Sequence, residues 1–376
     1  MSRSNHFEGF AAAGFSLVEL MIALLIGAFV SLGAVAFFLS TWNSTQLETS
    51  LARLQENGRF AVDLMREDLY RSQFLGCNTG DVFFFNMIED PTAPGANPDF
   101  QGVRGYERQG AGTWAALPNS TDLAAAITAA DTAAGARNGS DVLSIRMNER
   151  LNPDSPLLSS LVTAGSTAVD VSDNPDCVIE ASSRIIVTGC NLTAHLFEVT
   201  NTQSCNAATP PNPATLEFDG TANYETAINS TYGVQSEVLL FEEAVWFVAD
   251  TGRDQNGLDV WALYREVNGV REEMIEGVEH MQVKFGQRVD GSNALRFVDP
   301  SDALLNTGIN YERVISVRIA LLLQDYRQVV NGADTRAYLL NDELVPGGAQ
   351  GAAHGGGAVQ RSVFTTTLAL RNAPSV

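Results

Sequence analysis

Residues 14–39 read GFSLVELMIALLIGAFVSLGAVAFFL, and this stretch decides how the chain is organised. From Leu20 to Leu39 it has no charged side chain, and Ser31 carries its only hydroxyl group. A run of about 20 apolar residues can cross the hydrocarbon core of a bilayer as a helix. Trp42 follows where an aromatic ring would meet the membrane interface. The stretch therefore predicts one membrane-spanning helix near the N-terminus.

Glu19 lies at the start of this apolar stretch, where its charge requires a partner. An ionisable group within a membrane segment is costly and normally marks a partner or a function. Cleavage after Gly14 would give Phe15 a free amine, and a neighbouring subunit shifted along the helix axis would bring that amine to the carboxylate. The alternative is that Glu19 reaches the lipid headgroups from the helix end.

A secretory signal peptide is a second interpretation of the same segment. Such a signal begins with basic residues and is cut after its apolar stretch, where Ala34-Val35-Ala36 would fit. However, the leader contains a single arginine, Arg3, and Glu8 offsets its charge. Glu19 also lies too close to the apolar stretch for such a signal. These features speak against a secretory signal peptide.

Residues 14–27, GFSLVELMIALLIG, resemble the class III signal of type IV prepilins. The resemblance implies that residues 1–14 are a leader, which prepilin peptidase removes by cutting between Gly14 and Phe15 on the cytoplasmic side. It also implies that the peptidase methylates the new amine of Phe15. In such proteins the carboxylate at the position of Glu19 serves subunit registration during assembly.

Beyond Trp42 the pattern changes to that of an amphipathic helix. Apolar residues fall on one helical face, namely Leu47, Leu51, Leu54, Val62, Met65 and Leu69. Charged residues take the other face, namely Glu48, Arg53, Glu56, Asp63 and Arg66. At 1.5 Å per residue, a helix from Phe15 to about Tyr70 would be roughly 80 Å long. We expect residues 15–42 to form the transmembrane and assembly helix, and residues 43–76 to continue it along a globular head.

Two regions follow the helix. Residues 77–232 are rich in Ala, Asn, Thr, Gly and Pro, which predicts a loop-rich variable region with strands at Asp141–Met147 and Arg184–Thr188. Residues 233–376 are expected to form an antiparallel β-sheet domain, because β-branched and aromatic runs predict strands at Val238–Val248, Leu258–Val267, Val278–Phe285, Val314–Leu323 and Val363–Leu370. Apolar and polar residues alternate from 315 to 321, so the sheet should bury one face beneath the amphipathic helix.

The four cysteines are Cys77, Cys177, Cys190 and Cys205. They form no C-x-x-C pair and have no nearby histidines at zinc spacing, so we expect no metal site. If the region after the helix lies outside the cytoplasm, the cysteines should be oxidised to disulfides. We favour a bond between Cys190 and Cys205, and buried free thiols are the alternative.

Composition and motifs speak against nucleic-acid binding and catalysis. With 44 acidic and 23 basic residues, the formal charge of −21 repels phosphate backbones. The predicted mature chain keeps His195, His280 and His354, and none belongs to a metal-binding or nucleophile motif. Residues 254–257, DQNG, lack the spacing of a calcium loop and predict a β-hairpin turn. We expect no enzyme activity, no cofactor and no metal.

Three further stretches resemble the PilW family of minor pilins: LQENGRFA at 54–61, MIEGVEHMQV at 274–283 and FTTTLALRN at 364–372. The resemblance implies a pilin-like α+β fold, in which the long N-terminal helix packs on an antiparallel β-sheet head with a large loop-rich insertion. It implies a role in type IV pilus assembly, in a priming complex with other minor pilins near the tip, which supports adhesion and twitching motility. Implied partners are minor and major pilins, prepilin peptidase, the inner-membrane assembly platform and the membrane.

The same resemblance implies two locations. Before assembly the chain should span the inner membrane once, with its N-terminus in the cytoplasm and its head in the periplasm; after assembly it should lie in the fimbrium at the cell surface. Alternatives are a pseudopilin of a type II secretion system, a pilus-tip adhesin whose middle region binds a surface, and a membrane-tethered enzyme. Loss of pili on gene deletion favours the pilus role, whereas loss of secretion with intact pili favours the pseudopilin.

The first prediction concerns the N-terminus of the mature protein. Intact-mass measurement of the chain extracted from membranes should give a protein that begins at Phe15 and carries one additional methyl group. A mass that begins after Ala36 would support the secretory signal instead, and retention of Met1 would contradict both forms of processing.

Overall fold

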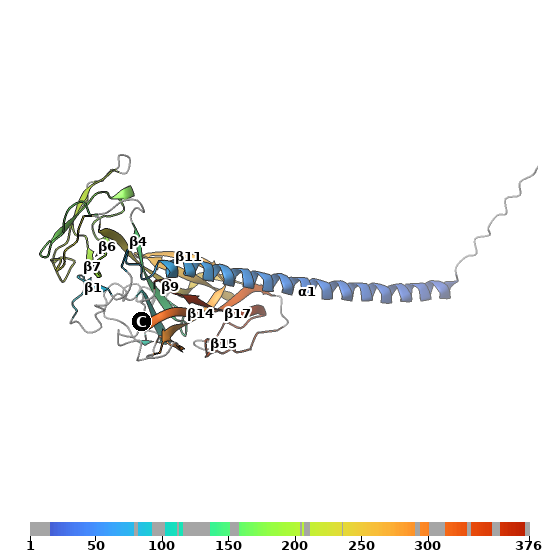
Figure 1. Cartoon of the computed structure of the whole chain (residues 1–376). Helices are drawn as coiled ribbons and strands as arrows, with labels where there is room; N and C mark the ends of the chain where they lie inside the picture. The colour runs from blue at the N-terminus through green and yellow to red at the C-terminus, as the bar shows by residue number, and fades with distance from the viewer. Residues whose placement is uncertain are drawn as a thin grey trace, which may run out of the picture. The chain divides into compact units, whose positions relative to one another are not determined.

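The computed structural model describes residues 16–78, 82–91, 102–110, 113–115, 136–150, 158–203, 205–206, 211–234, 236–289, 294–300, 313–328, 332–347 and 354–372. Within these residues one long helix, α1 (Leu17–Arg71), precedes a head made mostly of β-strands (Figure 1). The chain divides into two compact units, residues 1–50 and residues 51–376. The predicted α+β class is therefore confirmed.

Local chemistry sets both ends of α1. Ser16 precedes its first residue, and the Ser16 Oγ accepts a hydrogen bond of 3.2 Å from the backbone amide of Glu19. A serine followed three residues later by a glutamate is the sequence of a capping box, which satisfies free amides at a helix start. After Arg71 the backbone turns at Gln73, whose φ is 58°. This left-handed conformation ends the helix.

The larger sheet of the head has nine strands, in the order β1-β7-β6-β9-β4-β2-β3, with β10 beside β9 and β11 beside β10. Only the β1–β7 pair of this described sheet is parallel. The strands are β1 (Phe83–Asn86), β2 (Val103–Gly110), β3 (Thr113–Ala115), β4 (Val142–Arg150), β6 (Arg184–Gly189), β7 (Thr193–Glu198), β9 (Glu237–Gln255), β10 (Leu258–Val267) and β11 (Val270–Glu276).

The second sheet has four antiparallel strands in the order β13-β12-β14-β17. They are β12 (Val278–Arg288), β13 (Leu295–Val298), β14 (Val314–Gln328) and β17 (Val359–Ala369). Two small sheets complete the head. One pairs β5 (Ala168–Val171) with β8 (Ala214–Glu217), and the other pairs β15 (Tyr338–Leu340) with β16 (Glu343–Val345). A 3-10 turn, η1 (Pro175–Cys177), lies between β5 and β6.

The predicted C-terminal strands correspond to β9, β10, β12, β14 and β17, and they are antiparallel as expected. They divide between two sheets, whereas the sequence indicated one. The middle region also contains more strand than predicted, because β1 to β8 all lie within residues 77–232. Two of these, β4 and β6, are the strands predicted at Asp141–Met147 and Arg184–Thr188, and they hydrogen-bond to β9 on either side. The two strands with a clear local signal therefore pair with the buried central strand, and the other middle-region strands were not predicted.

The amphipathic part of α1 buries its apolar face as predicted, but it packs against both main sheets and not against one. Leu54, Val62, Met65 and Leu69 are buried in one core with inward-facing side chains of both sheets. These partners include Leu143, Trp246, Val248, Val317, Ile319 and Leu321. At Gly58 an added Cβ would come within 2.8 Å of the Phe364 ring, so the helix approaches β17 where glycine leaves room.

A short segment before β4 joins the two sheets to each other. The Met281 amide donates to Ser140 Oγ at 3.0 Å, and the Val283 amide donates to Asp141 Oδ2 at 2.8 Å. The Asp141 amide in turn donates to the Met281 carbonyl at 2.8 Å. Burial raises the pKa of Asp141 well above its ordinary value. The segment therefore takes the place of a neighbouring strand along part of β12.

Asp68 fastens the last turns of α1 to the larger sheet through charged hydrogen bonds. Its buried carboxylate accepts from Trp246 Nε1 at 2.9 Å and from Arg265 Nε at 2.8 Å and Nη2 at 3.0 Å. Arg71 Nη2, one turn along the helix, donates to the same carboxylate at 3.2 Å. Each polar group in this contact depends on the others, because burial without a partner is costly.

The second prediction follows from this contact. Asp68→Ala should lower the free energy of unfolding by about 3 to 5 kcal/mol, because it leaves the Arg265 guanidinium and the Trp246 N–H without their partner. Asp63→Ala is the matched control on the same helix: its pair with Arg66 is partly exposed, so the loss should stay below about 1 kcal/mol. Denaturant unfolding of the full chain in detergent would measure both, and equal losses would contradict the role given to Asp68.

Candidate functional site

The N-terminal part of α1 presents an almost continuous apolar surface. It is long and apolar enough to cross a membrane, by length and composition. Its large apolar side chains from Leu17 to Leu39 are 54% to 75% exposed. Gly14 and Phe15, the predicted cleavage and methylation positions, lie outside the described residues.

Glu19 lies in the first turn of α1, within this apolar surface. Its side chain is exposed, and no ion pair in the described part of the chain includes it. Its backbone amide donates to Ser16 Oγ at 3.2 Å. The carboxylate is thus available to a charge from outside the described residues.

The four cysteines form two disulfides, Cys77–Cys190 and Cys177–Cys205. The predicted bond between Cys190 and Cys205 is therefore wrong, and no described cysteine is free. The prediction relied on the short distance between Cys190 and Cys205 in the sequence. However, β7 begins at Thr193 and separates the two residues. Cys190 instead lies in the turn between β6 and β7, where Asn78 also contacts Thr188 and Leu192. One disulfide therefore ties the chain just beyond α1 to this turn, and the other closes a loop near β5 and β8.

The histidines of the head are buried, and the rings of His195 and His354 have polar neighbours at hydrogen-bond distance. His195 Nδ1 lies 2.5 Å from the Tyr232 hydroxyl, and Nε2 lies 2.8 Å from Asn229 Oδ1. The Phe85 ring stacks on the imidazole with centroids 4.6 Å apart. His354 Nε2 lies 2.7 Å from the Arg336 carbonyl, and His280 is buried in β12. Among the described residues, no group of three or more metal-binding side chains comes together.

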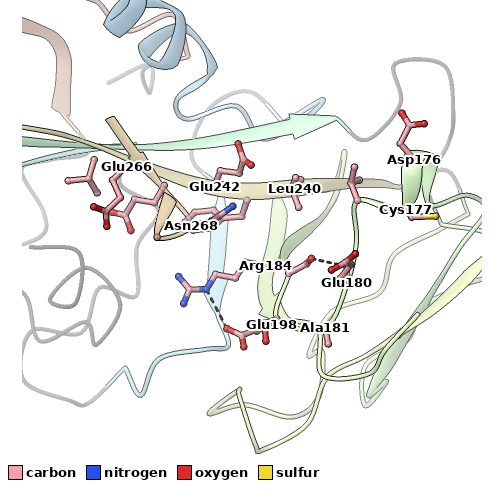
Figure 2. Close-up of a pocket in the computed structure, with 17 residues that line it drawn as sticks. Asp176, Cys177, Glu180, Ala181, Arg184, Glu198, Leu240, Glu242, Glu266 and Asn268 are labelled. Atoms are coloured by element: carbon pink, nitrogen blue, oxygen red, sulfur yellow. Dashed lines mark hydrogen bonds and ion pairs between the residues drawn. The ribbon is translucent and has the colours of Figure 1, made fainter. Parts of the chain in front are cut away.

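A pocket of about 1050 Å³ opens between the segment around η1, the middle of β9 and the turn from β10 to β11 (Figure 2). Most of its charged lining is acidic: Asp176, Glu180, Glu198, Glu242, Glu243 and Glu266. Arg184 Nε lies 3.5 Å from Glu198 Oε2, as the dashed line in Figure 2 marks. Burial raises the pKa of Glu242. The lining suits a cationic group better than an anionic one.

The turn predicted at residues 254–257 is a two-residue hairpin between β9 and β10. Gln255 pairs with Leu258, and Asn256 and Gly257 have φ values of 57° and 77°. Positive φ at both central residues defines the tight turn that Asn-Gly favours. This confirms the hairpin prediction.

Sequence reasoning missed a buried ion cluster in the second sheet. Arg361 Nε donates to Glu279 Oε2 at 2.7 Å, and Arg361 Nη1 lies 3.3 Å from Asp334 Oδ2. All three residues are buried. Burial acts to raise the pKa of Asp334, but hydrogen bonds from Arg336 and Tyr338 lower it below its ordinary value. No local pattern indicates this cluster, because its members come from β12, β17 and the segment before β15.

Comparison with known families agrees with both ends of the chain. Residues 10–35 match the prokaryotic N-terminal methylation motif, which is the motif of prepilins. Residues 252–372, which contain β10 to β17, match the family described as type IV pilus-assembly protein W. The chain is thus similar to prepilins at its N-terminus and to the PilW family over its last third. No curated protein and no solved structure matches it.

The third prediction concerns the buried His195. Burial lowers the pKa of His195 from its ordinary 6.5 to about 4. Between these values the unfolded chain binds a proton that the folded chain does not. Stability is therefore complete above about pH 6.5 and falls as the pH drops toward 4, by at most about 3 kcal/mol.

His195→Gln should remove this dependence. The slope of unfolding free energy against pH between 4 and 6.5 should become shallower by up to about 1.4 kcal/mol per pH unit. Urea unfolding of the full chain in detergent, followed by tryptophan fluorescence, measures the slope. The carboxylates are common to both proteins, so an unchanged slope would contradict the neutral buried imidazole.

Proposed function

We propose that this chain is a minor pilin, a structural and non-enzymatic subunit that takes part in type IV pilus assembly. The observation that carries the proposal is Glu19, a lone carboxylate in the first turn of an exposed apolar helix. In a helix that only spans a membrane, a carboxylate at this position is unfavourable, because removing the charge from water is costly. A helix that must dock beside other helices gains a specific contact from it.

The proposed assembly step pairs Glu19 with an amine. Prepilin peptidase cuts after Gly14 and methylates the amine of Phe15, and the helix then waits in the inner membrane with the head in the periplasm. In the growing filament, the Phe15 amine of an adjacent subunit reaches the Glu19 carboxylate. The ion pair neutralises both groups and fixes the axial position of one helix against the next. Apolar contacts alone would permit neighbouring helices to slide.

In this proposal the head lies at the surface of the fibre and contacts other subunits. Its match to the PilW family supports a complex with other minor pilins that primes assembly at the platform in the inner membrane. Because Glu19 is present, we propose that another subunit lies above this one, so that it need not be the outermost subunit of the tip. Adhesion and twitching motility would follow from the pilus that the complex starts. We propose the same pilin-like fold for the head, whose sheet is covered by α1.

The fourth prediction tests the pairing of Glu19. Glu19→Gln keeps the size of the side chain but removes its charge, and it should reduce the amount of this chain in sheared filaments at least about tenfold. Processing and membrane retention should continue, since the apolar segment is unchanged. Glu19→Asp should restore part of the incorporation.

Glu48→Gln is the matched control, because it removes one exposed carboxylate from the same helix beyond the apolar segment. It should leave incorporation unaltered. Filaments that contain normal amounts of the Glu19→Gln chain would contradict the proposed pairing. Normal piliation with lost protein secretion in a deletion strain would instead assign the chain to a secretion pseudopilus.

A further inference from the structure

The outer edge of β17 leaves a row of backbone groups unpaired among the described residues. Leu370 N donates to the Ile315 carbonyl, and the register of β14 with β17 is regular from there to Gln360. Hydrogen-bonded residues alternate along an antiparallel strand. Phe364, Thr366 and Leu368 therefore form backbone bonds to β14. The alternate residues direct their amides and carbonyls outward: Val363, Thr365, Thr367 and Ala369.

This edge is accessible and lacks the features that normally protect an edge strand. Thr365, Thr367 and Ala369 are exposed. No described residue outside β14 forms a backbone hydrogen bond with residues 363–369. The stretch VFTTTLA contains no charge and no proline, and its register has no bulge. Long uncharged edges of this kind pair readily with another strand.

One edge strand of the larger sheet, β11, provides a contrast within the same head. Its seven residues include Arg271, Glu272, Glu273 and Glu276. Charges along an edge discourage another strand from pairing with it. Of these two edge strands, β11 is therefore protected by charge, whereas β17 is not and forms a bare edge.

A second copy of this chain is a poor occupant of the bare edge. Phe364 lies against Gly58 and Asn372 donates to the Ser72 carbonyl at 2.9 Å, so β17 and α1 run in the same direction. Antiparallel pairing of two β17 strands would point two α1 helices in opposite directions. Subunits anchored by the same N-terminal segment enter a membrane or filament in one direction. The net charge of −21 on each copy opposes the pairing further.

We propose that the outer edge of β17, from Val363 to Ala369, receives an extended strand from a different subunit of the filament. This inference rests on the proposed function, because it places a second kind of subunit beside the head. Outward amides and carbonyls of β17 pair with the backbone of the incoming strand. The threonines beside the contact fit uncharged, β-branched residues of the partner. Backbone bonds supply most of the contact, so the partner is recognised mainly by its extended conformation.

The fifth prediction is a pattern of hydrogen exchange in β17. The full chain, with an affinity tag at its C-terminus, would be compared alone in detergent and in sheared filaments captured through the tag. At residue resolution, the amides of Val363, Thr365 and Thr367 should exchange at least about 100-fold more slowly in the filament. The amides of Phe364, Thr366 and Leu368 should be slow in both samples. The amides of β11 should exchange equally in both.

Fast exchange at Thr365 and Thr367 in filaments that contain the chain would overturn this inference and leave the proposed function standing. Absence of the chain from all filaments would overturn both. Thr365→Lys with Thr367→Lys places charge on the edge and keeps the backbone bonds to β14, although it removes the 3.3 Å bond from Arg318 Nε to Thr367 Oγ1. It should reduce incorporation at least about fivefold. Val270→Lys with Leu295→Lys, at the edges of β11 and β13, is the matched control and should incorporate normally. Equal incorporation of both double variants would also overturn the inference.

Discussion

The apolar face of α1 between Leu54 and Leu69 is the constraint on which the head depends. Both main sheets bury side chains against this face, Trp246 from the larger sheet and Val317 from the smaller one. A sheet needs cover on its apolar face, and each fully buried large side chain contributes roughly 1.5 to 3 kcal/mol. The two sheets thus share one cover. Asp68 adds direction to this contact, because its charged bonds to Arg265 hold only when the helix is correctly placed along its axis.

One helix therefore meets two different environments with the same kind of residue. Up to Leu39 its leucines and phenylalanines are exposed on all sides, which suits lipid or other helices. From Glu48 onward charged residues appear on one face, so the remaining apolar residues form a stripe that suits a protein core. The change requires no break in the backbone, since α1 is continuous from Leu17 to Arg71. The pattern of side chains alone therefore distinguishes the part of α1 that suits lipid or other helices from the part that packs in the core of the head.

The sequence predicts those features that depend on local periodicity. The helix, its buried stripe, the later strands and the Asn256-Gly257 turn all follow from residues close together in the chain. The division of strands between two sheets does not, because β9 pairs with β4 and β6 of the middle region, and no local pattern indicates which distant strands will pair. The same reason explains the disulfides. Arg361 shows the limit clearly: it looks like a solvated strand residue, yet Glu279 and Asp334 converge on it from distant segments. For the candidate site, Glu19 is evident from the sequence because its neighbours are apolar, whereas the bare edge of β17 becomes visible only once its register with β14 is known.

The disulfide between Cys77 and Cys190 has a mechanical consequence. It joins residues 113 positions apart and begins six residues after α1 ends at Arg71. When a fibre is pulled, tension that enters the head through α1 passes across the sulfur atoms directly to the start of β7. The segment between the two cysteines does not carry this force. The strands within it, such as β1, β2, β4 and β6, therefore cannot be unfolded and extended by the pull while the disulfide is intact. When the fibre is pulled, only the six residues from Ser72 to Cys77 can extend before the force reaches the larger sheet.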